Sequence, residues 1–157
     1  MTFCGKQMST TDISIRRVVE NDAEAVLTLL FSLGYPNIER ASFVDVFHRV
    51  LQHPEMVIYL AIDGSERVLG MLSLSHRLQL RLAGTLLSID ELAVLPEVRG
   101  HGIGQQLLSV ARDVAKELGA KRIELHTNRN RESYKRQFYI KNGFIEANSA
   151  LIRMDCE

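Results

Sequence analysis

The sequence predicts an α/β domain built around one mixed β-sheet, and three observations support this class. The chain has 157 residues, of which 46% are hydrophobic and 24% charged, as expected for one soluble globular domain. Apolar runs with turn residues between them predict hairpins, and a later strand–helix–strand succession predicts a crossover between parallel strands. No linker or repeat divides the chain. We therefore expect a single domain over residues 1–157, with a loose segment at residues 1–10.

The N-terminal part predicts one strand followed by two helices. Ile13–Val19 is rich in β-branched residues and predicts the strand. Asn21 or Asp22 can cap the first helix, which a Gly-Tyr-Pro run ends. Ser42 can cap the second helix, and His53-Pro54 ends it. The expected apolar stripes are Ala25, Val26, Leu29, Leu30 and Leu33 on the first helix, and Phe43, Val46 and Val50 on the second.

The middle of the chain changes to the pattern of strands. Val57–Ile62 and Val68–Leu74 predict a hairpin, joined by a turn at Asp63-Gly64-Ser65. Ser75–Gly84 is expected to be a loop. Thr85–Leu95 predicts a long strand that ends before a proline.

The C-terminal part supplies the crossover. Gly102–Leu118 predicts a helix, with Gly119 as its C-terminal cap. Arg122–Thr127 predicts the next strand, Ser133–Lys141 a short helix, and Ala150–Met154 a closing strand. The apolar face of the long helix comprises Ile103, Leu107, Val110, Ala111, Val114 and Leu118.

Composition excludes several classes of function. Lys+Arg and Asp+Glu both number 19, so the net charge is zero, unlike the basic excess of a general nucleic-acid binder. Cys4 and Cys156 lie at opposite ends of the chain and predict neither a disulfide framework nor a zinc site, and no histidine pair has metal-binding spacing. The apolar stretch Ala25–Phe31 is far shorter than a membrane span, and no signal peptide is recognised. We expect a cytoplasmic protein without a metal.

The most informative segment is Arg99–Gly104, which has glycines at three alternate positions between a strand and an amphipathic helix. A helix N-terminus has unsatisfied N–H groups and partial positive charge, and glycines let a bulky anion approach the backbone. No carboxylate occurs between Glu97 and Asp113, so the chain does not fill this site itself. The segment predicts a phosphate site, although a tight turn that packs helix on strand is the alternative. A P-loop is excluded because no Gly-Lys-Ser/Thr follows. A dinucleotide-binding motif fits poorly because its third glycine is missing, although Glu124 lies at the distance where that motif has an acidic residue.

Two motifs together resemble the GNAT superfamily of acyl-CoA-dependent N-acyltransferases. Arg99-x-x-Gly102-x-Gly104 is similar to the family's glycine loop, and Phe138-Tyr139-x-x-x-Gly143-Phe144 is similar to its later helix end. The resemblance implies a mostly antiparallel mixed sheet, flanked by about four helices, in which two parallel central strands splay apart. Acetyl-CoA would lie in that opening as cosubstrate.

The resemblance also implies which residues bind acetyl-CoA. The backbone of Leu92, Ala93 and Val94 would pair with the pantetheine, and the loop N–H groups would bind the pyrophosphate. Those loop residues are Arg99, Gly100, His101, Gly102, Ile103 and Gly104. Glu132 and Lys135 stand where the family commonly has asparagine and a small residue, so Asn128 or Asn130 would take over that contact. A solvent-exposed loop residue is the alternative for His101, and His126 either faces substrate or is an ordinary sheet residue.

Acetyl transfer to an amine needs a base, an oxyanion donor and an acid. Glu91 is the candidate base, because a carboxylate within an apolar strand is costly unless it is paired or used. Asp90 competes for this role, and an ion pair is the alternative for Glu91. The resemblance implies the backbone N–H of Leu92 or Ala93 as oxyanion donor. It implies Tyr139 as the acid, with Tyr134 as the second choice.

We expect transfer of an acetyl group from acetyl-CoA to a primary amine of a small molecule, by direct attack in a ternary complex. The alternatives are a protein N-terminal or lysine acetyltransferase and a non-catalytic CoA-binding sensor. Met56–Gly143 is similar to acetyltransferases of the aminoalkylphosphonate type, and His76, Arg77 and Arg81 in the predicted loop suit an acceptor with an anionic group, unless they are merely solvated. No nucleic-acid or membrane partner is expected, and a homodimer is left open.

Overall fold

The computed structural model describes residues 12–156, which form two compact units, one ending at His126 and one starting at Thr127. The first unit is built on a five-stranded sheet in the order β1-β2-β3-β4-β5. Its neighbouring strands are antiparallel except for β4 and β5, which are parallel, so the predicted mixed sheet is confirmed. The strands are β1 (Ser14–Arg17), β2 (Met56–Ile62), β3 (Val68–Gln79), β4 (Gly84–Val94) and β5 (Arg122–Leu125). The predicted segment at residues 1–10 lies outside the described residues.

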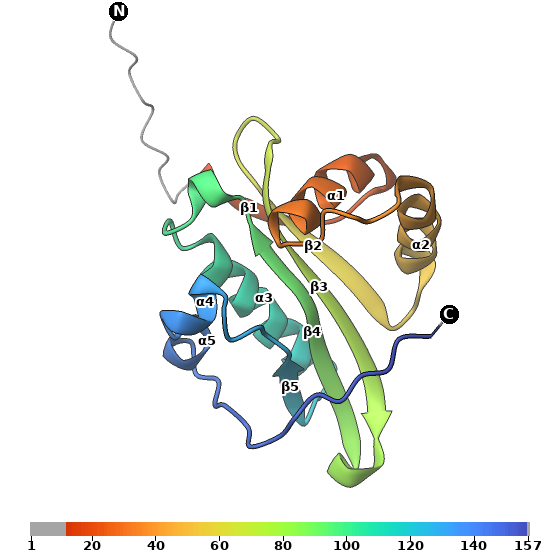
Figure 1. The fold of residues 1–157 in the computed structure, drawn as a ribbon, viewed down its shortest axis with the longest axis vertical. Coiled ribbons are helices and arrows are strands. Elements are labelled where there is room, and N and C mark those ends of the chain that lie inside the picture. Colours follow the sequence, from red (N-terminus) through yellow and green to blue (C-terminus); the bar gives the residue numbers. More distant parts are fainter. Residues whose placement is uncertain (1–11, 157) are drawn as a thin grey trace, which may run out of the picture. The chain divides into compact units, whose positions relative to one another are not determined.

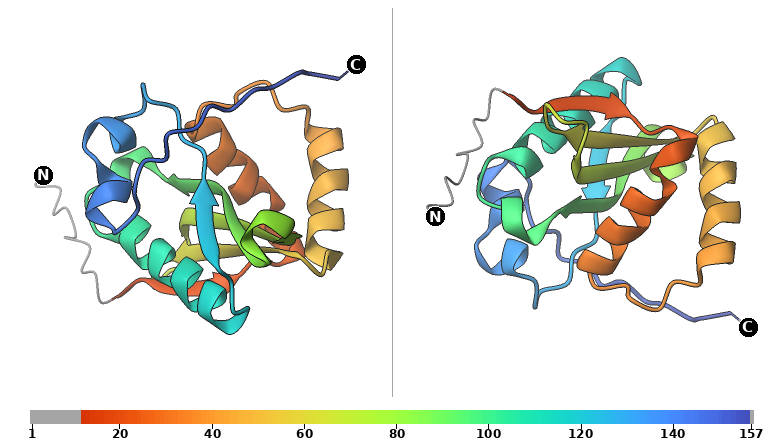
Figure 2. Two further views of the ribbon diagram at one scale, coloured as in Figure 1. Left: turned by 90° about the horizontal axis from the view of Figure 1, so that it is seen from below. Right: turned by 90° about the horizontal axis from the view of Figure 1, so that it is seen from above.

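Helices cover both faces of this sheet (Figures 1 and 2). Helices α1 (Ala23–Ser32) and α2 (Arg40–Gln52) pack on one face, and α3 (Ile103–Glu117) packs on the other. The core beneath α1 and α2 consists of Val26, Leu29, Phe47, Ile58, Leu60, Ile62, Met71 and Ala93. No helix within residues 12–156 is long and apolar enough to cross a membrane.

The apolar face of α2 differs from the predicted one. Val46 is 52% exposed, whereas Phe47 is only 2% exposed and its ring stacks on that of Phe43 at 5.7 Å. The prediction is therefore wrong for Val46 alone, since Phe43 and Val50 pack against the core as predicted. Phe47 is buried in place of Val46 because the larger aromatic side chain gains more from burial. Ser42 is not the cap of α2 either. The Glu39 carboxylate accepts hydrogen bonds from the backbone N–H groups of Ala41 and Ser42.

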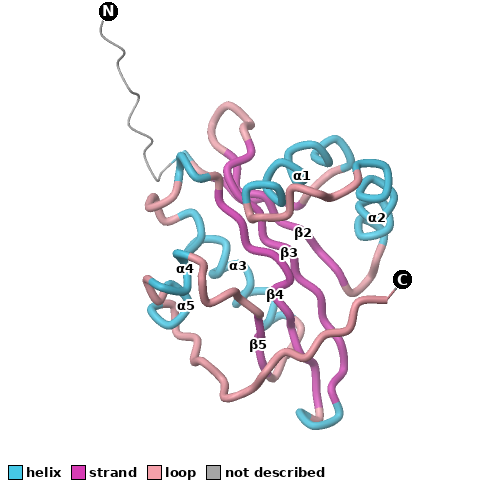
Figure 3. The backbone as a smooth tube through the Cα atoms, in the orientation of Figure 1, coloured by secondary structure: helices cyan, strands magenta, loops and turns pink. Residues whose placement is uncertain are grey.

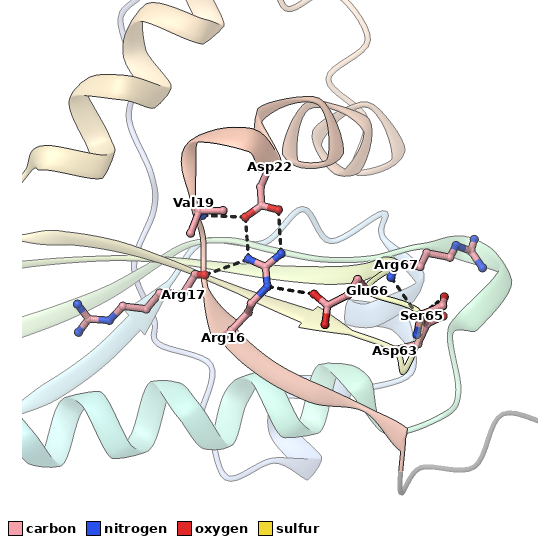
Figure 4. Close-up of polar contacts among 8 residues, drawn as sticks. All are labelled: Arg16, Arg17, Val19, Asp22, Asp63, Ser65, Glu66 and Arg67. Carbon is pink, nitrogen blue, oxygen red and sulfur yellow. Dashed lines mark hydrogen bonds and ion pairs between the residues drawn. The ribbon is translucent and has the colours of Figure 1, made fainter.

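A partly buried ion pair fixes the junction between β1 and α1 (Figure 4). The Arg16 guanidinium donates two hydrogen bonds to the Asp22 carboxylate, at 2.7 and 2.9 Å, and the N–H of Val19 donates a third at 2.7 Å. Asp22 is 8% exposed, and the bond from Arg16 lowers the pKa of its carboxyl group. The Asp22 carboxylate therefore accepts no hydrogen bond from the first turn of α1, as a side-chain cap would. It holds the preceding strand instead.

The β3–β4 hairpin is longer than predicted (Figure 3). Pairing continues to Gln79 and Gly84, so Ser75–Gly84 is not a loop but mostly strand, closed by a 3₁₀ turn over Leu80–Leu82. The strands β1, β2 and β5 and helix α3 lie within or close to their predicted ranges, and Gly119 follows α3 with a φ of +60°.

The second unit is small and contains two short helices, α4 (Glu132–Lys135) and α5 (Phe138–Lys141). One helix was predicted here, but Gln137 has a φ of +57°, which interrupts it. The predicted strand Ala150–Met154 is wrong, because no strand is found in the described residues beyond Leu125. A strand needs a neighbour for its backbone hydrogen bonds, and its sequence alone does not supply one.

Candidate active site

The glycine loop before α3 has the geometry of an anion-binding helix N-terminus. Gly100 and Gly102 have φ values of +83° and +79°, a region that other residues rarely adopt, so both positions require glycine. A Cβ atom at either position would meet nothing within 4 Å. Gly102 is the N-cap of α3, no side chain caps it, and the first turn has no acidic residue. The first N–H groups of α3 are thus left for a ligand with an anionic group.

Two side chains of this loop stabilise the loop itself. The Arg99 Nε donates to the carbonyl oxygen of Val94 at 3.0 Å, where β4 ends. The His101 Nδ1 lies 3.1 Å from the carbonyl oxygens of both Val98 and Arg99. Arg99 therefore places its charge at the end of β4, and His101 closes the turn before Gly102.

Strands β4 and β5 separate where the resemblance implies an opening. Their pairing ends at Ile89 and Leu125, yet β4 continues to Val94. No strand among residues 12–156 pairs with this edge of β4 beyond Ile89. The sheet thus leaves one edge of Leu92, Ala93 and Val94 open, next to the start of the glycine loop.

A bulge in β4 directs Glu91 to one face of the sheet. Ser73 pairs with Glu91 and Leu74 with Ile89, so Asp90 has no partner and is exposed. Glu91 and Ala93 lie on the same face of the sheet, because they are two residues apart along the strand. Ala93 belongs to the core under α1, so this is the face that α1 covers.

Burial raises the pKa of the Glu91 carboxyl group, and the negative charge of Asp90 raises it further. A hydrogen bond with Ser73 opposes both effects. Ser73 is 4% exposed and lies opposite Glu91 on β3. Sequence reasoning did not include Ser73, because a serine within a strand carries no signal until the register is known. The ion pair considered as the alternative for Glu91 is not found among the described residues.

Close packing holds α3 against β3 at the site. A Cβ atom on Gly70 would lie 2.8 Å from the carbonyl oxygen of Ala93 and 3.3 Å from Cγ2 of Ile103. It would also lie 3.4 Å from Cδ1 of Leu107. Gly70 therefore allows the first two turns of α3 and the open segment of β4 to approach each other. Sequence reasoning missed this position, since a lone glycine in a strand can have several roles.

The second unit contains the tyrosines considered for the acid. Tyr139 packs edge-on against the rings of Phe138 and Phe144, at 5.1 and 6.0 Å, and burial raises the pKa of its hydroxyl group. Within residues 12–156 no hydrogen bond is found to that hydroxyl. Tyr134, by contrast, donates to Glu146 at 2.9 Å. Asn128 turns its side chain onto its own loop, where it accepts from the N–H of Asn130 at 2.8 Å.

A surface depression lies elsewhere on the first unit. Its volume is about 350 Å³, and its lining includes Tyr59, His76 and, on the last turns of α3, Val114 and Leu118. The glycine loop lies at the other end of this 15-residue helix, about 22 Å away. None of the residues predicted to bind acetyl-CoA or to act in catalysis lines the depression, whereas His76, predicted to suit an anionic acceptor, does. His126, considered for substrate contact, is exposed at the end of the first unit.

The sequence pattern of the Acetyltransferase (GNAT) family matches residues 23–144. The chain belongs to this family. This N-acetyltransferase is 35% identical over 133 residues to the aminoalkylphosphonate N-acetyltransferase of Salmonella typhimurium, with 85% of each chain covered. A transcriptional regulator from Bacillus halodurans has the same fold, with a TM-score of 0.81, 27% identity, and coverage of 92% of this chain and 99% of that one.

The fold is also shared by an aminoglycoside N-acetyltransferase solved in complex with CoA, with a TM-score of 0.79 and 16% identity. The match covers 91% of this GNAT enzyme and 94% of that chain. The bare N-terminus of α3 and the open edge of β4 are suited to the pyrophosphate and the amides of such a coenzyme. Among residues 12–156 no group of three or more His, Cys, Asp or Glu side chains could hold a metal ion.

Proposed function

We propose that this enzyme transfers the acetyl group of acetyl-CoA to a primary amine of a small molecule, by direct attack in a ternary complex. The observation that carries the proposal is the uncapped N-terminus of α3, which the glycine loop joins to the open edge of β4. Acetyl-CoA supplies an acetyl group activated as a thioester. The family membership and the 35% identical aminoalkylphosphonate N-acetyltransferase support this reaction class.

The chain's backbone would provide most of the binding of acetyl-CoA. The N–H groups from Gly102 to Gly104 would bind the pyrophosphate, since the positive end of the α3 dipole favours negative charge there. Leu92, Ala93 and Val94 would pair with the pantetheine as a neighbouring strand does. The N–H of Leu92 or Ala93 would donate to the thioester oxygen as it gains negative charge.

Glu91 would act as the base. An amine with a pKa of about 10 is protonated at neutral pH and must lose a proton before it attacks. Burial raises the pKa of Glu91, which makes its carboxylate a stronger base than an exposed one. The protonated amine gives one proton to Glu91, and the neutral nitrogen then forms a bond to the acetyl carbon. As the bond from carbon to sulfur breaks, the nitrogen loses a second proton, which replaces the one that the acid gives to the leaving thiolate, so one proton is released overall.

Tyr139 would protonate the leaving thiolate. Its hydroxyl has no hydrogen-bond partner among the described residues, whereas Tyr134 is bound to Glu146. A tyrosine hydroxyl is protonated at neutral pH, and burial raises the pKa of Tyr139 further, so it would first stabilise the thiolate as a hydrogen-bond donor and then give up its proton. The free hydroxyl favours Tyr139 over Tyr134, since the pKa of Tyr134 is also raised, by its hydrogen bond to Glu146.

A protein N-terminus or lysine as acceptor, or a non-catalytic sensor of CoA, would use the same coenzyme site. A panel of small amines, peptides and acetyl-CoA, with detection of free thiol, separates these functions. We expect thiol release with small amines, and strong loss of turnover in Glu91→Gln and Tyr139→Phe, with Tyr134→Phe as the matched control. CoA binding without turnover would indicate the sensor, and turnover with peptides alone would indicate the protein acetyltransferase.

A further inference from the structure

The polar part of the sheet face that bears Glu91 extends along β3 and β4. On this face the cross-strand pairs are Met71 with Ala93, Ser73 with Glu91, Ser75 with Ser88, and Arg77 with Leu86. The first pair, Met71 and Ala93, belongs to the core under α1. The next two pairs are polar, because they consist of three serines and the carboxylate of Glu91. The face thus changes from apolar to polar at the residue proposed as the base.

Arg77 ends this polar row, and its guanidinium is not engaged. Within residues 12–156 every other arginine has a hydrogen bond, an ion pair, a ring contact or another electrostatic interaction, and Arg77 has none. Its neighbour Arg81 pairs with Glu124 at 3.6 Å, and Glu124 also accepts from Arg122 at 3.2 Å. The adjacent His76 points to the α3 face, where it lines the depression. Of the three basic residues expected to favour an anion, Arg77 alone is left with its charge uncompensated on the face of Glu91.

The spacing suits a short bifunctional acceptor. Arg77 lies four residues along β3 from Ser73, which is directly opposite Glu91, so the two positions are about 13 Å apart along the strand. The long side chain of arginine reduces this gap to the length of a small molecule. The hydroxyl groups of Ser75 and Ser88 lie between the two ends, where they can donate hydrogen bonds.

We infer that Arg77 determines acceptor specificity by binding an anionic group of the acceptor while its amine lies at Glu91. A guanidinium binds phosphonate, phosphate or carboxylate through parallel hydrogen bonds, which gives both orientation and affinity. The inference rests on the proposed function. It narrows the acceptor to small amines that carry an anion a few bonds from the nitrogen.

The test compares two acceptors that differ in the anion. Acetylation of 2-aminoethylphosphonate and of n-propylamine is followed by thiol release in the wild type and in Arg77→Gln. We expect the wild type to prefer the phosphonate and Arg77→Gln to lower its kcat/KM roughly 10- to 100-fold, mainly through KM. Activity with n-propylamine should change less than about twofold. Arg49→Gln, which removes an exposed charge of α2, is the control and should leave both activities unchanged.

Binding without turnover provides a second readout. The Kd of 2-aminoethylphosphonate for the CoA complex should rise in Arg77→Gln by the same factor as KM. Wild-type activity that is equal with both amines, or an equal loss of both in Arg77→Gln, would overturn the role of Arg77 and leave the proposed function standing. No thiol release with any amine, together with no binding of the phosphonate, would overturn both.

Discussion

Gly70 is the position where a single methyl group should disturb the proposed coenzyme site without touching a ligand. In Gly70→Ala the new Cβ would lie 2.8 Å from the Ala93 carbonyl oxygen, a distance that side chains do not tolerate. Ile103 and Leu107 of α3, both buried, would be met at 3.3 and 3.4 Å. Either β4 or the start of α3 must move. Overpacking of this kind costs about 1–3 kcal/mol of the free energy of unfolding.

The assay measures stability and CoA affinity together. The cost of overpacking corresponds to a fall in Tm of about 2–12 °C for a chain of this size. The Kd of CoA should rise by more than tenfold, because Ala93 and the first turn of α3 are the parts displaced. Gly64→Ala is the matched control. A Cβ atom at Gly64 would meet nothing within 4 Å and the residue has no positive φ, so stability should change by less than about 1 kcal/mol and CoA affinity should stay constant. Unchanged CoA affinity in Gly70→Ala would refute this reasoning.

Two further predictions concern pH. The ion pair with Arg16 lowers the pKa of Asp22, so its stabilisation is present above the unfolded pKa of about 4 and is lost as the pH falls through the lower folded value. Asp22→Asn should therefore cost about 2–3 kcal/mol near neutral pH in urea unfolding, and the difference should vanish in strong acid; a constant difference would contradict this. For Glu91, burial raises the pKa, so the acidic limb of kcat/KM should lie above the ordinary range of a carboxyl group and disappear in Glu91→Gln. Ser73→Ala should move that limb to still higher pH, and an unmoved limb would rule out Glu91 as the titrating base.

The local pattern of the sequence predicted most of the first unit. The periodicity of α3 and the alternation along β4 are properties of neighbouring residues, so they are visible in the chain. The length of the β3–β4 hairpin could not be predicted in this way, because residues such as Arg77 are polar whether they lie in a loop or at the exposed end of a strand. The same holds for α2, where the choice between Val46 and Phe47 depends on the space beneath the helix.

The candidate site divides in the same way. The uncapped glycine loop was predictable, since Gly100 and Gly102 and the absence of nearby acids are local features. Ser73 and Gly70 were not predictable, because their importance comes from the register that places them opposite Glu91 and Val94. The uncompensated charge of Arg77 likewise became visible only when Glu124 was found paired with Arg81 and Arg122.

The most direct measurement is the shift in Tm that CoA causes in the wild type and in two variants at opposite ends of α3. At a hundredfold excess over its Kd, CoA should stabilise the wild type by about 2.7 kcal/mol, or roughly 5–11 °C. Gly102→Asp combined with Arg99→Glu should abolish this shift, because a carboxylate then occupies the place of the pyrophosphate. Gly119→Asp introduces the same side chain at another glycine with positive φ and should keep the shift. A full shift in the double variant would contradict the assignment of the α3 N-terminus as the binding site of the coenzyme.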